Sequence, residues 1–292
     1  MRMRKHFATG AALAAAAALV LTACGGGGST GSAGGTNDTL TAGVAYETTD
    51  YGPITTSALG MGTNWQVLEG LYRFNMADYS VSPALAAGDP VKVSDTEYEV
   101  SLRDGAKFSD GTDVTAADFV ASYERATSEK SIYRQFFTFV DSVEAKDDKT
   151  ITITLKHPFT NLKERFVNVR VVPASMGEDA LKAKPVGTGP YKYESITATE
   201  VTVVPNEYYN GNEPAKAPTL KWQSLKDDSA RLAAAVGGTV DIMEAVPASA
   251  QDQLKAAGWN VESKPGYGNP FLIFQTQDAH FDNPAGRSAF AK

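Results

Sequence analysis

Residues able to do acid–base, nucleophilic or metal chemistry are few in this 292-residue sequence. The three histidines, His6, His157 and His280, are far apart in the chain, and no Gly-x-Ser-x-Gly motif that could carry a nucleophilic serine is present. No set of His, Cys or carboxylate residues has the spacing of a metal site. We therefore expect a protein that is not an enzyme and that uses no metal or cofactor. Carboxylates from distant segments could still converge, which leaves a secreted hydrolase as an alternative.

Two Asp-Gly pairs, Asp104-Gly105 and Asp110-Gly111, resemble catalytic aspartates at first sight. Glycine adopts the positive φ of a tight turn without steric cost, and aspartate also favours turns. We interpret both pairs as turns, and the nearby charges of Arg103 and Lys107 as solvated or paired locally.

The one reactive thiol is Cys24, at the end of Leu21-Thr22-Ala23-Cys24. A cationic start and a 15-residue apolar run, Phe7–Leu21, precede it. That run is shorter than the roughly 20 residues that span a bilayer, which is typical of a secretory signal. The four residues resemble the lipobox of bacterial lipoproteins, in which the leader is cut before an acylated cysteine. We expect a signal peptide at 1–23 and a lipid on Cys24; the alternative is an ordinary signal peptide with a chance cysteine.

A segment of small residues follows Cys24, and Gly25–Thr36 is almost entirely Gly, Ser, Thr and Ala. Such a segment buries little apolar surface, so we expect a flexible tether over 24–38. Without the three basic leader residues the chain has 24 basic and 34 acidic residues, a net charge of −10. This charge argues against binding to nucleic acid or to an anionic lipid surface. With a single cysteine, no internal disulfide is possible.

Folded sequence begins near Thr39, and hydrophobic patterning predicts mixed α and β structure. Apolar residues alternate with polar ones in several predicted strands, of which the clearest are Glu97–Arg103 and Thr150–Leu155, the latter in a hairpin with Val140–Ala145. Further strands are predicted around Val201–Val203, Trp259–Val261 and Phe271–Phe274. Helices are predicted after a capping box at Thr115–Asp118 and over Asn64–Tyr72, Ser229–Val236 and Pro247–Ala257, the last two ending at glycines.

A longer pattern lies across these elements. Leu102–Arg125, which contains both Asp-Gly pairs and the capping box, resembles the signature of family 5 extracellular solute-binding proteins. These are the peptide-, dipeptide- and nickel-type receptors of ABC importers. Further landmarks of that family follow in the same order, namely Val67–Phe74, Ser82–Ala86, Pro185–Tyr191, Pro205–Tyr209, Gly238–Ile242 and Phe281–Phe290.

The resemblance implies an α/β, periplasmic-binding-protein-like fold of the class II type, in which two lobes close on a ligand. It places lobe one at 39–73 and 185–270, an inserted α+β subdomain at 74–184, and a crossing strand with the start of lobe two at 271–292. The crossing strand would be Phe271–Gln277, and a helix would begin near Arg287. Family members continue for roughly as much chain again, so lobe two is expected to be missing from these 292 residues.

By position in the family fold, three segments would meet the ligand at strand ends. They are Thr55, Thr56 and Ser57, then Met243, Glu244 and Ala245, and finally Phe274, Gln275, Thr276 and Gln277. Each has an alternative reading: the hydroxyls as a helix cap or turn, Glu244 as a solvated carboxylate, and Phe274 as part of the lobe core. Glu244 would be the partner for a ligand amine.

The resemblance implies a monomeric, lipid-anchored receptor on the outer face of the cytoplasmic membrane, whose partner is an ABC permease. Peptides are the favoured ligand. A nickel chelate, a glycoside or a siderophore is an alternative ligand, and a surface protein without a transport role is an alternative function.

Overall fold

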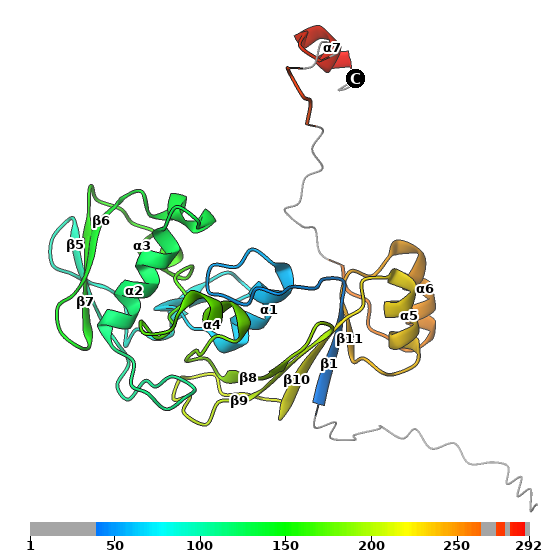
Figure 1. Cartoon of the computed structure of the whole chain (residues 1–292), viewed down its shortest axis with the longest axis horizontal. Helices are drawn as coiled ribbons and strands as arrows, with labels where there is room; N and C mark the ends of the chain where they lie inside the picture. The colour runs from blue at the N-terminus through cyan, green and yellow to red at the C-terminus, as the bar shows by residue number, and fades with distance from the viewer. Residues whose placement is uncertain (1–38, 264–272, 278–280, 290–292) are drawn as a thin grey trace, which may run out of the picture. The chain divides into compact units, whose positions relative to one another are not determined.

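The computed structural model describes residues 39–263, 273–277 and 281–289. The predicted signal peptide, Cys24 and the tether lie outside the described residues. Within the described residues, the larger sheet has five strands in the order β11-β1-β10-β9-β8 (Figure 1). The strands are β1 (Thr39–Val44), β8 (Tyr191–Ile196), β9 (Glu200–Pro205), β10 (Thr219–Ser224) and β11 (Ile242–Met243).

Strand direction in this sheet decides where its loops emerge. β1 is parallel to both of its neighbours, β10 and β11, whereas β9 is antiparallel to β10 and to β8. The carboxyl ends of β1, β10 and β11 therefore meet at the same edge of the sheet. The loops that precede β8 and β10 lie at the opposite edge.

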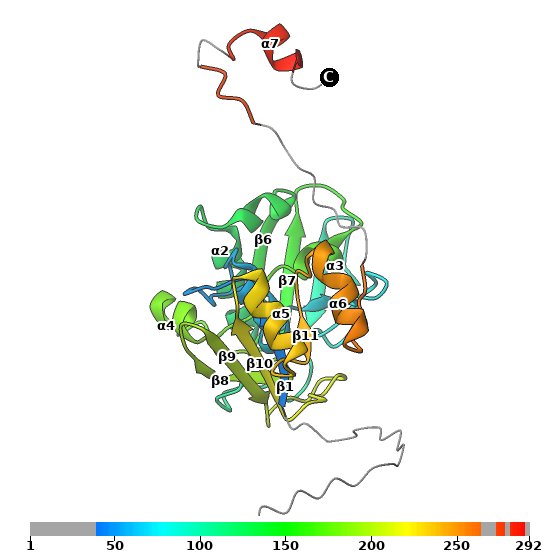
Figure 2. The same cartoon turned by 90° about the vertical axis from the view of Figure 1, so that its right-hand side faces the viewer.

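Helices cover both faces of this sheet because its strands bury side chains on both sides. On one face, Val44 of β1 and Tyr193 of β8 pack in a core with residues of α1 (Ala58–Val67) and α4 (Glu178–Ala183). On the other face, Met243 packs with residues of α5 (Asp228–Val236) and α6 (Gln251–Ala256), which follows a short 3-10 helix, Ala248–Ala250. Figure 2 views the face that α5 and α6 cover.

A second, antiparallel sheet has the strand order β4-β5-β7-β6. Its strands are β4 (Val91–Lys92), β5 (Glu97–Ser101), β6 (Val140–Ala145) and β7 (Thr150–Leu155). Around it lie a hairpin of β2 (Tyr72–Phe74) and β3 (Val81–Pro83), the helices α2 (Ala116–Thr127) and α3 (Leu162–Phe166), and a 3-10 helix, Ile132–Phe137. The predicted β6–β7 hairpin and the predicted β5 strand are confirmed.

The capping box that begins α2 is also confirmed. The backbone N–H of Thr115 donates to Oδ2 of Asp118 at 2.9 Å. Phe119 and Ala126 then lie on the buried face of the helix. A side chain at the third helical position can satisfy an amide at the helix start, so this sequence pattern fixes where α2 begins.

The two sheets have separate cores, and these support a division of the chain into lobe one and an insert. One core draws its buried residues from between Leu71 and Val171, and the other includes Val172 and Leu181. We propose that the insert is bounded close to residues 71 and 171, whereas the sequence placed it at 74–184.

Three sequence predictions of secondary structure are wrong. The helix predicted over Asn64–Tyr72 is α1, which begins at Ala58 after the cap residue Ser57 and ends at Val67. Leu68 and Leu71 are buried as predicted, but they lie after the helix in a segment that becomes extended at Leu68. Trp259 and Val261 form no strand, although both pack against the core under α6.

The crossing segment is the third error. Residues 273–277 of the predicted strand form no strand, and residues 271–272 lie outside the described residues. The helix predicted near Arg287 is present as α7 (Pro284–Ala289).

Candidate functional site

Three chain segments meet where the parallel strands β1, β10 and β11 end. We call residues 45–47, 225–227 and 244–246 the carboxyl edge. Backbone hydrogen bonds hold them side by side: the N–H of Leu225 donates to the carbonyl of Val44 at 2.8 Å, and that of Glu244 donates to Gly43 at 3.0 Å. Nζ of Lys226 also lies 2.9 Å from Oε1 of Glu47. Sheets of parallel strands bind ligands at this kind of edge.

The three predicted residues of β11 and its loop have different environments. Met243 is buried with Leu254 in the core under α5 and α6, so its side chain is structural. Glu244 is exposed, and among the described residues no cation lies within ion-pair distance of its carboxylate. Ala245 is also exposed and has a left-handed φ of 52°. Glu244 is therefore the side chain of this segment that is available to a ligand; that it binds one stays a prediction.

The hydroxyls of the first predicted segment mostly serve the loop itself. Oγ1 of Thr55 donates to the carbonyl of Asp50 at 2.9 Å, and Thr55 is buried. Oγ of Ser57 accepts from the amide of Gly60 at 3.5 Å, which caps α1. Thr56 is exposed. The structure thus contains the turn and cap that the sequence offered as the alternative, and contact with a ligand stays a prediction.

A buried polar network holds this loop against α1. Nδ2 of Asn64 donates to the carbonyls of Tyr51 and Gly52 at 2.9 and 3.2 Å. Oδ1 of Asn64 accepts from the hydroxyl of Tyr193 at 2.9 Å, and burial raises the pKa of that tyrosine. Because each group is satisfied inside the protein, the loop that precedes α1 has one favoured conformation.

The third predicted ligand segment, Phe274–Gln277, is not part of a strand. The ring of Phe274 lies 5.2 Å from that of Phe281, while Gln275, Thr276 and Gln277 are exposed. Oε1 of Gln275 accepts from the amide of Gln277 at 3.4 Å, which is a turn contact. A ligand role for these four residues stays a prediction.

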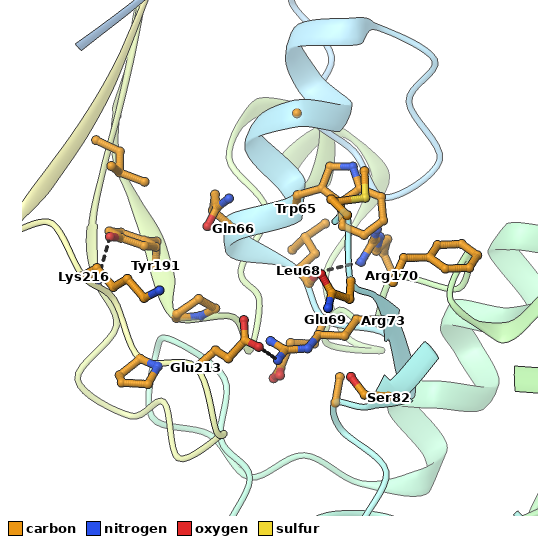
Figure 3. Close-up of a pocket in the computed structure, with 18 of the residues that line it drawn as sticks. Trp65, Gln66, Leu68, Glu69, Arg73, Ser82, Arg170, Tyr191, Glu213 and Lys216 are labelled. Carbon is orange, nitrogen blue, oxygen red and sulfur yellow. Dashed lines mark hydrogen bonds and ion pairs between the residues drawn. The ribbon is translucent and has the colours of Figure 1, made fainter. Parts of the chain in front are cut away.

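A pocket of about 650 Å³ lies at the opposite edge of the sheet, among α1, the β2–β3 hairpin and the loop before β10 (Figure 3). Its wall includes Arg170, whose guanidinium carbon lies 4.2 Å from the ring centroid of Trp65. Burial lowers the pKa of Arg170 to about 10, so this side chain is still charged at neutral pH. Arg73 pairs with Glu213 in the same wall. None of the ten predicted ligand residues lines this pocket.

An ion pair between Glu69, which lines the pocket, and the partly buried Arg103 joins the insert to lobe one. Nη2 of Arg103 is 3.1 Å from Oε2 of Glu69, and Nε of Arg103 donates to Oδ1 of Asn210 at 2.9 Å. Burial raises the pKa of Glu69, and Arg103 opposes that shift. The prediction that Arg103 is solvated or paired locally is therefore wrong, because its partners are 34 and 107 residues away. Lys107 does pair locally, with Asp113 at 2.5 Å.

The sequence did not predict three of these contacts, namely Arg103 with Glu69, Glu47 with Lys226, and Arg170 with Trp65. Each joins residues that are more than 30 positions apart. The sequence signal available was only the presence of a charged residue within an apolar segment, as with Glu69 between Leu68 and Leu71.

Residues 39–263, 273–277 and 281–289 contain no group of three His, Cys, Asp or Glu residues placed to hold a metal ion. No helix in the same part of the chain is both long and apolar enough to cross a bilayer.

Curated relatives cover most of this chain but less than half of their own length. The glutathione-binding protein GsiB of Salmonella typhi is 29% identical in an alignment of 236 residues that covers 76% of this chain and 45% of GsiB. GsiB of Escherichia coli K12 is 28% identical over the same length. The chain thus spans about half the length of the curated relatives it matches.

Solved structures agree on the fold. The PBP AgaA from A. tumefaciens R10, in complex with agropinic acid, superposes with a TM-score of 0.68 at 28% identity and covers 75% of this chain and 46% of AgaA. DppA of Helicobacter pylori, in complex with the peptide STSA, gives a TM-score of 0.70 at 20% identity, over 86% of this chain and 55% of DppA. At that identity DppA supports the fold alone.

The family assignment comes from residues 80–292, which match the bacterial extracellular solute-binding proteins, family 5 Middle. This match covers more than half of the chain and includes the segment that carries both Asp-Gly turns, the capping box and β11. The fold is the α/β, periplasmic-binding-protein-like fold of these proteins, and the chain is a member of the bacterial extracellular solute-binding proteins, family 5.

Proposed function

We propose that this chain is the first lobe of a lipid-anchored receptor that binds peptides at the carboxyl edge and delivers them to an ABC permease. The observation that carries the proposal is the meeting of three parallel-strand ends at an exposed edge that presents Glu244. An exposed carboxylate can bind the amino group of a peptide by a charge-assisted hydrogen bond. Backbone groups at the same edge can pair with an extended peptide as a strand does.

Relatives support a ligand with amide and charged groups, but they differ in detail. GsiB is named for glutathione, which makes a peptide-like ligand the favoured class. AgaA was solved with agropinic acid, and a nickel ABC transporter protein from Bacillus halodurans, 25% identical, has a TM-score of 0.64. Because these proteins are associated with solutes of different classes, a solute other than a peptide stays the alternative ligand of the same kind of receptor. A surface protein without a transport role would have the same fold but no cognate permease.

Titration with trialanine tests the binding proposal. We expect trialanine to shift the backbone NMR signals of the carboxyl edge, with weak affinity of about 1 mM, because the chain spans about half the length of its relatives. Replacing Glu244 by Gln is expected to weaken binding about tenfold, since a hydrogen bond to a charged group is lost. The matched control is Glu144→Gln, which removes an exposed carboxylate from β6 in the insert.

Glutathione and nickel with histidine are titrated in parallel. Signals that move only with nickel and histidine would replace peptides by a chelate. Shifts confined to Trp65, Arg170 and Lys216 would move the binding site to the pocket of Figure 3. Tight, saturable binding of trialanine by this chain alone would contradict the expectation that closure needs a second lobe.

Lipid attachment is tested at Cys24 in the expressing bacterium. We expect the chain to incorporate an alkyne-labelled fatty acid and to fractionate with membranes, and Cys24→Ser to lose both properties. Ser29→Ala, in the predicted tether, is the control and is expected to keep both. Export of an unlabelled wild-type chain into the medium would instead support the ordinary signal peptide.

A further inference from the structure

A buried arginine lies directly behind the carboxyl edge. Arg231, in α5, is 1% exposed. Its Nη1 donates to the carbonyls of Leu225 and Lys226 at 2.7 and 2.9 Å, and its Nη2 donates to the carbonyl of Ala245 at 3.3 Å and pairs with Asp228. One guanidinium thus joins the segment that follows β10 to the segment that follows β11.

The segment that follows β11 has a backbone conformation that needs such support. Ala245 has a φ of 52°, in the left-handed region, which is sterically unfavourable for a residue with a Cβ. A non-glycine residue keeps this conformation only where its surroundings impose it. Two hydrogen bonds hold the chain around Ala245. The N–H of Glu244 donates to the carbonyl of Gly43, and Nη2 of Arg231 donates to the carbonyl of Ala245.

The chemistry of the guanidinium suits this task. Its planar array of donors can reach several acceptors in fixed directions, which a lysine ammonium on a flexible chain cannot do. The cost of burying the charge is offset by Asp228 one turn earlier in α5 and by three carbonyl oxygens. Within the described residues Nε of Arg231 has no hydrogen-bond partner, and the hydrogen bonds of this side chain come from its two terminal nitrogens.

We propose that Arg231 is a positioning residue that fixes residues 244–246 against residues 225–227 and so sets the direction in which Glu244 faces a ligand. Arg231 itself does not touch the ligand, because it is buried. The effect on ligand binding rests on the proposed function, whereas the positioning of the two segments does not and is measured without ligand.

The experiment compares Arg231→Met and Arg231→Lys in the purified protein by NMR. Without ligand, we expect Arg231→Met to move the Cα and Cβ shifts of Ala245 away from left-handed values. Hydrogen exchange at the Glu244 amide is expected to speed up about tenfold, since the loss of a charged donor frees the segment. Amides of β8 and β9 should keep their exchange rates. Arg231→Lys should restore part of the protection.

Arg125→Met is the matched control. Arg125 also donates to two backbone carbonyls, those of Ala174 and Met176, and pairs with Glu178, but it lies at α2 and not at the carboxyl edge. We expect this variant to lose stability and to keep the wild-type signals of Ala245 and Glu244. With trialanine, Arg231→Met should bind several-fold more weakly than Arg125→Met.

The outcomes separate the two proposals. Unchanged Ala245 shifts and unchanged Glu244 exchange in Arg231→Met, or equal changes in Arg125→Met, would overturn the positioning role. If Arg231→Met does not fold, Arg231→Lys decides, because it keeps the charge and must still change both signals. A different outcome would keep the positioning role and reject the peptide function. In that outcome Arg231→Met changes the Ala245 shifts and the Glu244 exchange without ligand, and trialanine moves no signals of the wild type.

Discussion

Replacing Arg103 by glutamine is expected to lower the free energy of unfolding by about 3–5 kcal/mol. Glu69 is almost fully buried, and Arg103 is its cationic partner at 3.1 Å. Without the guanidinium, the carboxylate would be buried and uncompensated, and the bond to Asn210 across the insert and lobe one would also be lost. Urea unfolding at neutral pH, followed by circular dichroism, measures this change.

The pH dependence of that loss distinguishes a charge effect from a packing effect. Burial raises the pKa of Glu69 above its usual 4.5, and removing Arg103 should raise it further, because Arg103 lowers it. Between pH 4.5 and the raised value, the folded state then binds more protons than the unfolded state, so stability falls as pH rises. Both proteins lose stability in this way above pH 4.5, so the deficit of Arg103→Gln should be small at low pH and grow only above the raised pKa that Glu69 has in the wild type, where the variant still binds the proton.

Lys107→Gln is the control for this prediction. Lys107 belongs to the same sequence block and pairs with Asp113, but its side chain is 38% exposed and that of Asp113 is 70% exposed. An exposed ion pair contributes about 0–1 kcal/mol, so this variant should stay close to the wild type. A deficit of Arg103→Gln that does not change with pH would show that packing, and not the charge of Glu69, explains it.

Replacing Gly187 by alanine is expected to cost about 3 kcal/mol of unfolding free energy. A Cβ at this position would lie 2.1 Å from the carbonyl oxygen of Val67 and 2.5 Å from Cδ2 of Leu68. The backbone of the segment before β8 passes directly against the last turn of α1, where the Gly189 amide donates to Val67 at 2.9 Å. Thermal and urea unfolding measure the loss.

Gly62→Ala is the matched substitution and has the opposite expected sign. Gly62 lies within α1, and a Cβ there would meet no atom within 4 Å. Alanine favours helix over glycine by about 1 kcal/mol, so Gly62→Ala should stabilise the protein. Equal effects of the two substitutions would mean that α1 and the segment before β8 are not in close contact.

Local patterns predicted those elements whose burial is regular along the chain. β7 buries Ile151, Ile153 and Leu155 in strict alternation, so its period identifies it as a strand. Helix α2 has a cap that lies within four residues of its own start. In both cases the deciding contacts are local, and a single sequence contains them.

Sequence patterns were insufficient where contacts with other segments decide the outcome. Val67, Leu68 and Leu71 are spaced like one face of a helix, yet the helix ends at Val67 and the other two are buried by different neighbours. For Thr55 and Ser57 the sequence allowed ligand contacts or a turn and cap; the structure shows the turn and the cap, and a ligand role for both residues stays a prediction. A sequence pattern can predict that a residue is buried without showing whether that residue lies in a helix or in the segment after it.

Sequence patterns alone indicated that few groups here could do chemistry, and the ordered motifs from Val67 to Phe290 identified the family. The sequence also supplied the expectation of a lipid on Cys24. The fold was needed to show that Arg103 pairs with Glu69, that Arg231 donates to the carbonyl of Ala245, and that Met243 is buried while Glu244 is exposed. The physical reason is distance along the chain: local propensity fixes caps and strands, whereas ion pairs and the edge of a parallel sheet join residues that only the fold brings together.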